Sequence, residues 1–320
     1  MIRPRGSWWL AGLLALAPVP GLTVEIVIGV PNWPSVSVTA HIIEVILETR
    51  YGAQVELQTA ANPVIFEAMA KGSMHIHPEV WLPNQQPLYE RYAASLVRNG
   101  HPARGVQGIC ANGAAREAGI RDVSDLTDPA KTLLLDSDAD GRGEIFIGAP
   151  GWSSTLVERL RAREYGYALM LTTVEMDEGL SDSQLAIAEQ RARPWVGFCY
   201  APHHRFIIHP DLKLLSEPPY QERQWHVPAG EQDKLPARVG MGWPPQLIQP
   251  MFSKTLAARL PVAATLLQNM DLTSEDMSQF AFEIVVNKKD PAEYARSWVG
   301  TNTARIARWL KPAAAAQRND

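Results

Sequence analysis

The sequence has few of the residues that support thiolate-metal, nucleic-acid or membrane chemistry. Its 320 residues include only two cysteines, Cys110 and Cys199, too few for a metal site built from thiolates. The pair is compatible with one disulfide in an oxidising compartment or with two buried free thiols. Acidic residues outnumber basic ones, 34 against 30. The net charge of −4 therefore gives no electrostatic reason to bind nucleic acid or an anionic membrane.

Catalytic motifs are also missing. The chain has no Gly-x-Ser-x-Gly elbow, no Walker loop and no Gly-x-Gly-x-x-Gly fingerprint. The segment from Gly151 to Ser154 is not an elbow, because it lacks the second glycine. We therefore expect no catalytic residues, no cofactor and no enzymatic activity.

The N-terminus carries a targeting pattern. Two arginines precede an apolar run from Trp8 to about Leu22, which is too short to span a bilayer and is typical of a signal peptide. Prolines interrupt the expected cleavage pattern, so an uncleaved anchor is the alternative. We expect residues 1–23 to be a signal peptide and the chain to be periplasmic or extracytoplasmic. No second apolar stretch is long enough to cross a membrane.

Strands and helices alternate along the chain. Periodicity predicts strands at 24–30, 54–58 and 74–81, with a helix ending at Tyr51–Gly52 and another running from an N-cap at Asn62 to Gly72. This β-α-β-α-β order argues for a parallel sheet in an α/β lobe. The pattern restarts near Val106, with strands at 108–111, 146–149 and 196–200 and helices at 155–164 and 180–193. Residues 218–245 are predicted to be a connector, and the chain from Ser253 onward to be mostly helical.

Histidines in two places invite a metal interpretation. His75, His77 and Glu79 would share one side of a strand, and imidazole with carboxylate suits zinc. No cysteine supports such a site, and the adjacent His203 and His204 cannot easily face one ion. We expect these histidines to be surface or hydrogen-bonded residues and predict no metal.

The segment Asp136-Ser-Asp138-Ala-Asp140-Gly begins like a calcium loop. An EF-hand needs a bidentate acid at its twelfth position, which is Ile147 here. Glu144 at the ninth position is a partial substitute. The residues leave two interpretations open, a structural Asp/Gly turn and a calcium site.

Four aromatic residues lie at or just beyond the ends of predicted strands. Trp33 follows the first strand, Trp81 ends the third, Trp152 lies between a strand and a helix, and Tyr200 ends a strand. Ligands of open α/β sheets bind beyond the carboxyl ends of strands, so these residues can converge on one cleft. Aromatic faces around a cation form a cation–π cage, each contact contributing on the order of 0.5–2 kcal/mol. A quaternary ammonium fits such a cage, because its charge is diffuse.

Ser153 and Ser154 follow Trp152 directly and are predicted to be the N-cap and first turn of the next helix. A helix N-terminus offers free N–H groups and a partial positive charge. A cage beside it suits a zwitterion such as a betaine.

At these residues the chain resembles the periplasmic substrate-binding proteins of glycine betaine/proline betaine ABC transporters, the ProX/OpuAC-like family, over roughly residues 24–300. The best stretches are 66–83, 135–152 and 196–203. In the family each of these segments supplies one aromatic of the cage, which implies Trp81, Trp152 and Tyr200. The third aromatic is usually Trp, so Tyr200 is a departure that keeps a π face and adds a hydroxyl.

The resemblance implies further contacts. The backbone N–H groups of Ser153 and Ser154, and in some members the counterpart of His203, hold the ligand carboxylate. Trp33 occupies a place where choline-binding relatives also use an aromatic, and Asn32 beside it is a candidate ligand contact.

Glu79 is the least typical feature. On a strand it would share a side with Trp81, where a carboxylate favours a positively charged ligand such as choline. A protonated Glu79 would instead donate to an N-oxide oxygen. The alternative is that Glu79 caps or pairs elsewhere.

These observations predict a two-lobed α/β periplasmic-binding-protein fold, type II-like, with the ligand in the cleft between the lobes. Lobe one comprises residues 24–107 and 240–320, and lobe two 108–239. The lobes are expected to close by a hinge motion. The predicted function is binding of glycine betaine or proline betaine for an ABC importer, with choline or trimethylamine N-oxide as alternatives, and an amino acid or metal as a further one. The resemblance implies a membrane permease as partner, and we expect a monomer.

Overall fold

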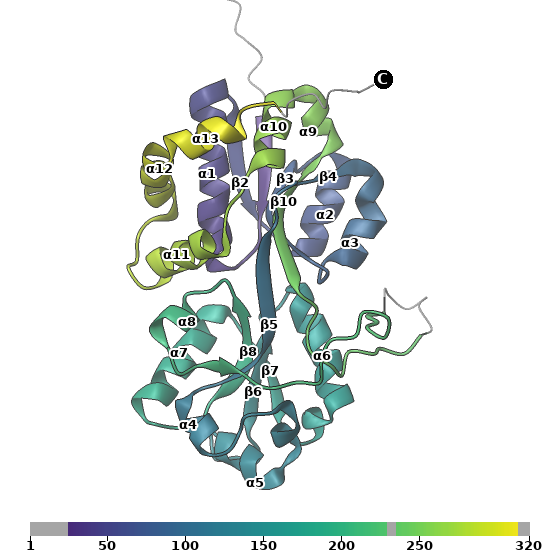
Figure 1. Ribbon diagram of the computed structural model, residues 1–320, viewed down its shortest axis with the longest axis vertical. Coiled ribbons are helices and arrows are strands. Elements are labelled where there is room, and N and C mark those ends of the chain that lie inside the picture. Colours follow the sequence, from purple (N-terminus) through teal and green to yellow (C-terminus); the bar gives the residue numbers. More distant parts are fainter. Residues whose placement is uncertain (1–24, 229–234, 313–320) are drawn as a thin grey trace, which may run out of the picture.

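The computed structural model describes residues 25–228 and 235–312 and shows two α/β lobes, one above the other in Figure 1. The predicted signal peptide at 1–23 lies outside the described residues. Hydrogen-bonded strands follow the order β2-β1-β3-β10-β5-β8-β6-β7 through both lobes, with β4 on β10 and β9 on β5.

The upper lobe begins with the predicted β-α-β-α-β unit. Its strands are β1 (Glu25–Val30), β2 (Gln54–Thr59), β3 (Ile76–Leu82), β4 (Leu96–Arg98) and β10 (Gln246–Ser253). Its helices are α1 (Pro34–Tyr51), α2 (Asn62–Lys71), α3 (Gln86–Tyr92), α9 (Lys254–Arg259), α10 (Pro261–Asn269), α11 (Ser274–Val285), α12 (Pro291–Thr301) and α13 (Thr303–Trp309), with the 3₁₀ turn η1 (Ala93–Ser95).

The local signals of this unit are mostly confirmed. β1 pairs in parallel with β2 and β3, and five of its six residues are buried, as expected of an apolar strand with helices on its faces. Gly52 ends α1 and Gly72 ends α2, both in the left-handed conformation that favours glycine. The predicted N-cap Asn62 is wrong. Ala61 is the N-cap, and Asn62 is the first helical residue, whose side chain is turned to His77.

The lower lobe repeats the alternation. Its strands are β5 (Ala103–Ala111), β6 (Glu144–Gly148), β7 (Thr172–Glu175), β8 (Val196–Ala201) and β9 (Lys213–Leu214). Its helices are α4 (Gly113–Glu117), α5 (Pro129–Thr132), α6 (Ser153–Tyr165), α7 (Glu178–Gln190) and α8 (Arg205–Ile208), with 3₁₀ turns η2 (Val123–Thr127), η3 (Leu133–Leu135) and η4 (Tyr167–Leu169).

Cys110 and Cys199 lie on the paired strands β5 and β8 and are both buried free thiols. Of the two interpretations left open by the sequence, the structure has the buried thiols. Burial raises the pKa of the Cys110 thiol, so this residue is held in its neutral, unreactive form.

Two strands carry the chain between the lobes. β5 pairs with β10 through residues 103–105 and with β8 through residues 106–111. β10 continues upward to pair with β3 and β4 (Figure 1). The described residues of the predicted connector, 218–228 and 235–245, contain no helix and no strand, and five helices follow from Lys254, as expected. This crossover places the ends of β3 and β8 next to each other.

Candidate functional site

A pocket of about 330 Å³, counted with its space open to solvent, lies between the lobes. Its lining residues are Trp33, Asn62, Trp81, Asn84, Gln85, Gln107, Trp152, Ser153, Ser154 and Tyr200. All four aromatics that the sequence placed at strand ends are among them.

The aromatic side chains stand edge to face. The Tyr200 ring lies 5.4 Å from the Trp81 ring and 5.6 Å from the Trp152 ring, with interplanar angles of 86° and 85°. Trp33, Trp81, Trp152 and Tyr200 are each 6–8% exposed, so their faces are nearly free of water. Desolvated aromatic faces around one space attract a cation that carries no hydrogen-bond donors.

A tight turn places Trp152 at the start of α6. Gly148 has φ +123°, and a Cβ there would lie 2.3 Å from Thr155 Oγ1, so the close packing of β6 on α6 requires glycine. Trp152 is the N-cap of α6 and Ser153 its first residue, so the predicted N-cap at Ser153 is one position too late. The first N–H groups of a helix have no intrahelical acceptor, and Ser153 and Ser154 at the start of α6 line the pocket.

Asn32 does not line the pocket. Its side-chain Oδ1 accepts a hydrogen bond of 2.8 Å from the indole Nε1–H of Trp152. Because Asn32 follows β1 and Trp152 precedes α6, this bond joins the upper lobe to the lower one. In this structure Asn32 is therefore a hydrogen-bonded link between the two lobes rather than a residue of the pocket lining.

Glu79 also lies outside the pocket lining. It is 0% exposed, and its Oε2 accepts hydrogen bonds of 2.8 Å from both Trp33 Nε1 and Ser35 Oγ. Its Oε1 accepts from Thr39 Oγ1 at 2.5 Å. Burial raises the pKa of Glu79, against these three hydrogen bonds, which lower it. In this structure Glu79 pairs within the protein, the alternative that the sequence left open, and its contact with a ligand stays a prediction.

The strand histidines form hydrogen bonds within the protein. His77 Nε2 lies 3.0 Å from Asn62 Oδ1, and His77 Nδ1 accepts from the Glu79 N–H at 3.3 Å. The imidazole is therefore neutral with its proton on Nε2. Burial lowers the pKa of His77 to about 3. His75 Nδ1 likewise accepts from the Val27 N–H at 3.0 Å.

His203 lies behind Tyr200 rather than beside the ligand space. The two rings are 4.6 Å apart, and His203 is 2% exposed. His203 Nε2 is 3.0 Å from Glu178 Oε1. His203 is not among the residues that line the pocket in this structure, and its contact with a ligand carboxylate stays a prediction.

Three amides that line the same pocket, Asn84, Gln85 and Gln107, were missed. Asn84 Nδ2 donates to Gln107 Oε1 at 2.7 Å, whereas Asn84 Oδ1 and Gln85 Oε1 are buried without a hydrogen-bond partner in the described part of the chain. Gln85 is only 3% exposed. Asn84 and Gln85 follow the strand that ends with Trp81. The strand-end rule that selected the aromatics would therefore have found them, had it been applied to polar residues.

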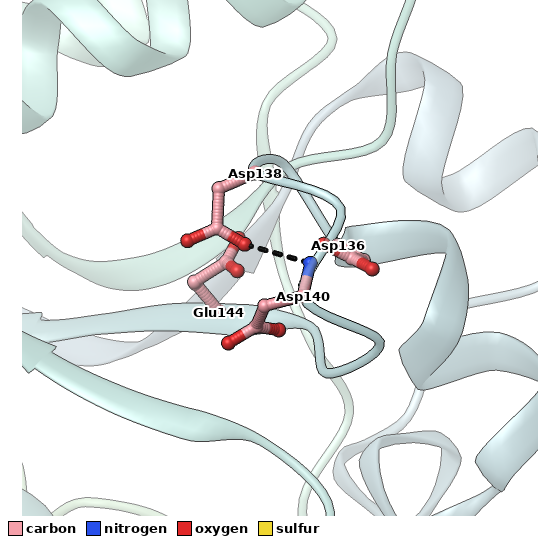
Figure 2. A group of neighbouring side chains, drawn as sticks. All are labelled: Asp136, Asp138, Asp140 and Glu144. Carbon is pink, nitrogen blue, oxygen red and sulfur yellow. Dashed lines mark hydrogen bonds between the residues drawn. The ribbon is translucent and has the colours of Figure 1, made fainter.

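The acidic loop forms a separate group below, between η3 and β6. Ligand oxygens of Asp136, Asp138, Asp140 and Glu144 lie within 4.8 Å of one another, a donor set suited to a hard cation. The same carboxylates accept backbone N–H groups. Asp136 bonds Ala139 at 2.7 Å and Gly141 at 2.9 Å, and Figure 2 shows the bond from Asp140 to Asp138. These bonds account for the predicted Asp/Gly turn.

Within residues 25–228 and 235–312, no helix combines the length and apolar character needed to cross a membrane.

Two known binding proteins are similar to this chain over most of its length. The glycine betaine/proline betaine-binding periplasmic protein of Salmonella typhimurium is 23% identical, the match covering 73% of this chain and 75% of the relative. The trimethylamine N-oxide-binding protein of Pelagibacter ubique is 24% identical over 87% of this chain and 88% of the relative.

Solved structures share the fold. An ABC-transporter choline-binding protein in complex with choline has a TM-score of 0.71 at 20% identity, covering 89% of this chain and 91% of its own. Lactococcal OpuAC in its closed form with glycine betaine also has 0.71 at 20% identity, covering 90% and 100%. The two-lobed architecture is thus that of a periplasmic binding protein. The family model for the substrate-binding domain of ABC-type glycine betaine transport systems matches residues 24–301, and the chain belongs to that family.

Proposed function

We propose that the chain binds a small quaternary ammonium or betaine-type osmolyte through cation–π contacts with Trp33, Trp81, Trp152 and Tyr200. The observation that carries this proposal is the clustering of four nearly water-free aromatic side chains around one pocket. No ionised carboxylate or metal group lines that pocket among the described residues, so the aromatic faces are the groups that would attract the positive charge.

The polar end would hold the oxygen atoms of the ligand. The N–H groups of Ser153 and Ser154 at the start of α6 suit a carboxylate, since a helix N-terminus favours negative charge. Asn84 and Gln85 offer amides beside them. This pairing favours glycine betaine or proline betaine. Choline and trimethylamine N-oxide are the alternatives, because each also joins a methylated nitrogen to one oxygen.

The wider setting follows from the family. We propose that the mature chain works outside the cytoplasm as a monomer without catalytic activity and passes its ligand to a membrane permease. We place the boundary between the lobes near residues 107 and 240, because β5 changes its pairing partner from β10 to β8 at residues 105–106.

Intrinsic tryptophan fluorescence tests the proposal. The mature chain is titrated with glycine betaine, proline betaine, choline and trimethylamine N-oxide. A saturable change with at least one of them is expected. Calorimetry then measures the same ligand on Trp152→Ala, which removes one wall and one reporter. Absence of binding to all four compounds would contradict the proposal and direct attention to amino acids and metals.

A further inference from the structure

A second buried acid lies behind the wall formed by Tyr200. Glu178 is the first residue of α7 and is 4% exposed, and its Oε2 accepts a hydrogen bond of 3.1 Å from the Tyr200 hydroxyl. Glu178 does not line the pocket. It therefore reaches the ligand space only through the phenol ring.

The ion pair of Glu178 among the described residues is with a histidine. His203 Nδ1 accepts the Arg205 N–H at 3.1 Å, so the ring carries its proton on Nε2 and is neutral. Burial lowers the pKa of His203 and keeps it in this form. His203 Nε2 lies 3.0 Å from Glu178 Oε1 but is poorly aligned for a full hydrogen bond. The Arg205 guanidinium pairs with Asp182, and its Nη2 also donates to the backbone carbonyl of Glu178 at 3.4 Å, so its positive charge lies close to Glu178.

The same lobe contains a matched pair with the opposite arrangement. Tyr167 donates its hydroxyl to the buried Glu158, just as Tyr200 does to Glu178. Glu158, however, also has the Arg161 guanidinium at 3.0 Å, which neutralises its charge. Among the ion pairs of the described residues, Glu178 has no arginine or lysine partner. A buried carboxylate without a direct ion pair to arginine or lysine is costly, so the position of Glu178 beneath the cage points to a role there.

Resting on the function proposed above, we infer that Glu178 is a positioning residue that makes the cage selective for a cation. Its carboxylate fixes the Tyr200 ring edge-on to Trp81 and Trp152. A phenol that donates to an anion has a more electron-rich ring, and the attraction of that ring for a cation is electrostatic. A positive ligand in the cage is thus attracted by the phenol ring more strongly than a neutral one of the same shape.

The experiment compares a cation with its neutral isostere. Wild type, Glu178→Gln and Glu158→Gln are titrated calorimetrically with choline and with 3,3-dimethylbutan-1-ol, in which carbon replaces the charged nitrogen. Glutamine keeps an oxygen that accepts the phenol hydrogen bond and removes the charge. We expect Glu178→Gln to weaken choline binding by roughly threefold to tenfold and to change binding of the alcohol by less than about twofold. Glu158→Gln should change neither.

Equal losses for the two ligands would overturn the inference, because they would show a purely structural role. So would an unchanged affinity for choline. Should Glu178→Gln not fold, Tyr200→Phe removes the coupling hydroxyl and keeps the ring, and the same preferential loss of choline is expected. In the Tyr200→Phe background, Glu178→Gln should have little further effect. If the wild type binds choline but the variants do not discriminate, only this inference fails. If the wild type binds no quaternary ammonium, the proposed function fails.

Discussion

The aromatic and the amide side chains of the pocket use their polar atoms in opposite ways. The aromatic group is Trp33, Trp81, Trp152 and Tyr200, and the amide group is Asn84, Gln85 and Gln107. Three of the four aromatic side chains have their polar group hydrogen-bonded within the protein: Trp33 Nε1 to Glu79, Trp152 Nε1 to Asn32, and the Tyr200 hydroxyl to Glu178. In the amide group, Asn84 Oδ1 and Gln85 Oε1 are buried without partners.

This difference indicates which part of the ligand each group of side chains would contact. A methylated ammonium has no hydrogen-bond donors, so free polar atoms around it would remain unsatisfied; turning them outward leaves only π faces. A buried polar group without a partner costs about 1–3 kcal/mol, which is tolerable where a ligand completes it. The hydrogen bonds of Trp33, Trp152 and Tyr200 are therefore formed before the ligand arrives, whereas those of Asn84 and Gln85 are completed by the ligand.

The largest effect should come from removing a member of the aromatic group. Trp81→Ala removes a wall 5.4 Å from the Tyr200 ring, and we expect affinity for the preferred ligand to fall at least about 30-fold, equivalent to about 2 kcal/mol. Trp298→Ala, on α12 and stacked on Trp309 away from the pocket, is the matched control and should leave affinity unchanged. Equal losses in both variants would mean that the cage is not where the ligand binds.

The buried support of the aromatic group should show in the pH dependence of stability. The pKa of His77 falls from 6.5 to about 3 on folding, so the unfolded chain takes up a proton that the folded chain refuses. Stability contributed by neutral His77 is thus present above pH 6.5 and lost as pH falls toward 3, by up to about 1.4 kcal/mol per pH unit. Glu79, whose pKa is raised by burial, contributes the opposite slope.

Urea unfolding of wild type and His77→Gln between pH 4 and 6.5 isolates this contribution, since Glu79 is present in both proteins. The free energy of unfolding of the variant should fall less steeply with acid. Parallel pH profiles would show that His77 is not held neutral by the fold.

Replacing an amide of the pocket should not lower the stability of the ligand-free protein, but it should lower the affinity for ligands that carry an oxygen. Gln85→Leu removes a buried oxygen that lacks a partner, so the ligand-free protein should become no less stable to heat. Affinity for glycine betaine or choline should fall by roughly threefold to tenfold, whereas tetramethylammonium, which has no oxygen, should bind as before. Gln246, which also has a buried oxygen without a partner but lies outside the pocket, provides the control Gln246→Leu. A loss of tetramethylammonium binding would contradict this prediction, because it would show that Gln85 contacts the methylated ammonium rather than the ligand oxygen.

The smallest effect concerns the bond that joins the lobes behind the cage. Asn32→Ala removes the acceptor of Trp152 Nε1, and a partly buried hydrogen bond of this kind contributes about 0.5–1.5 kcal/mol. All ligands should therefore weaken alike, by roughly twofold to tenfold. Calorimetry with glycine betaine and tetramethylammonium checks this, and a loss confined to glycine betaine would instead make Asn32 a contact of the ligand oxygen.

The sequence predicted the fold and the aromatic group well, for a physical reason. Strands such as β1 show in their apolar runs, helix ends in Gly52 and Gly72, and strand ends then place Trp33, Trp81, Trp152 and Tyr200 at one edge. These are local signals combined with one topological rule.

The orientation of side chains was not predictable in the same way. Strand alternation put Glu79 on the side of Trp81, but Trp33, Ser35 and Thr39, from a segment 40 to 46 residues earlier, donate to its oxygens. His203 likewise lies against Glu178, which belongs to α7. Such pairings depend on tertiary contacts that no local pattern encodes.

The most direct test of the cation cage compares methylated ligands with their unmethylated counterparts in one calorimetric series on the wild-type chain. Glycine betaine is paired with glycine and choline with ethanolamine, so that each pair keeps its oxygen atoms and carbon skeleton and differs in the three N-methyl groups. We predict saturable binding of at least one methylated compound and no measurable binding of its counterpart, because a primary ammonium would lose its hydrogen bonds to water among aromatic faces. Equal or tighter binding of glycine or ethanolamine would contradict the account.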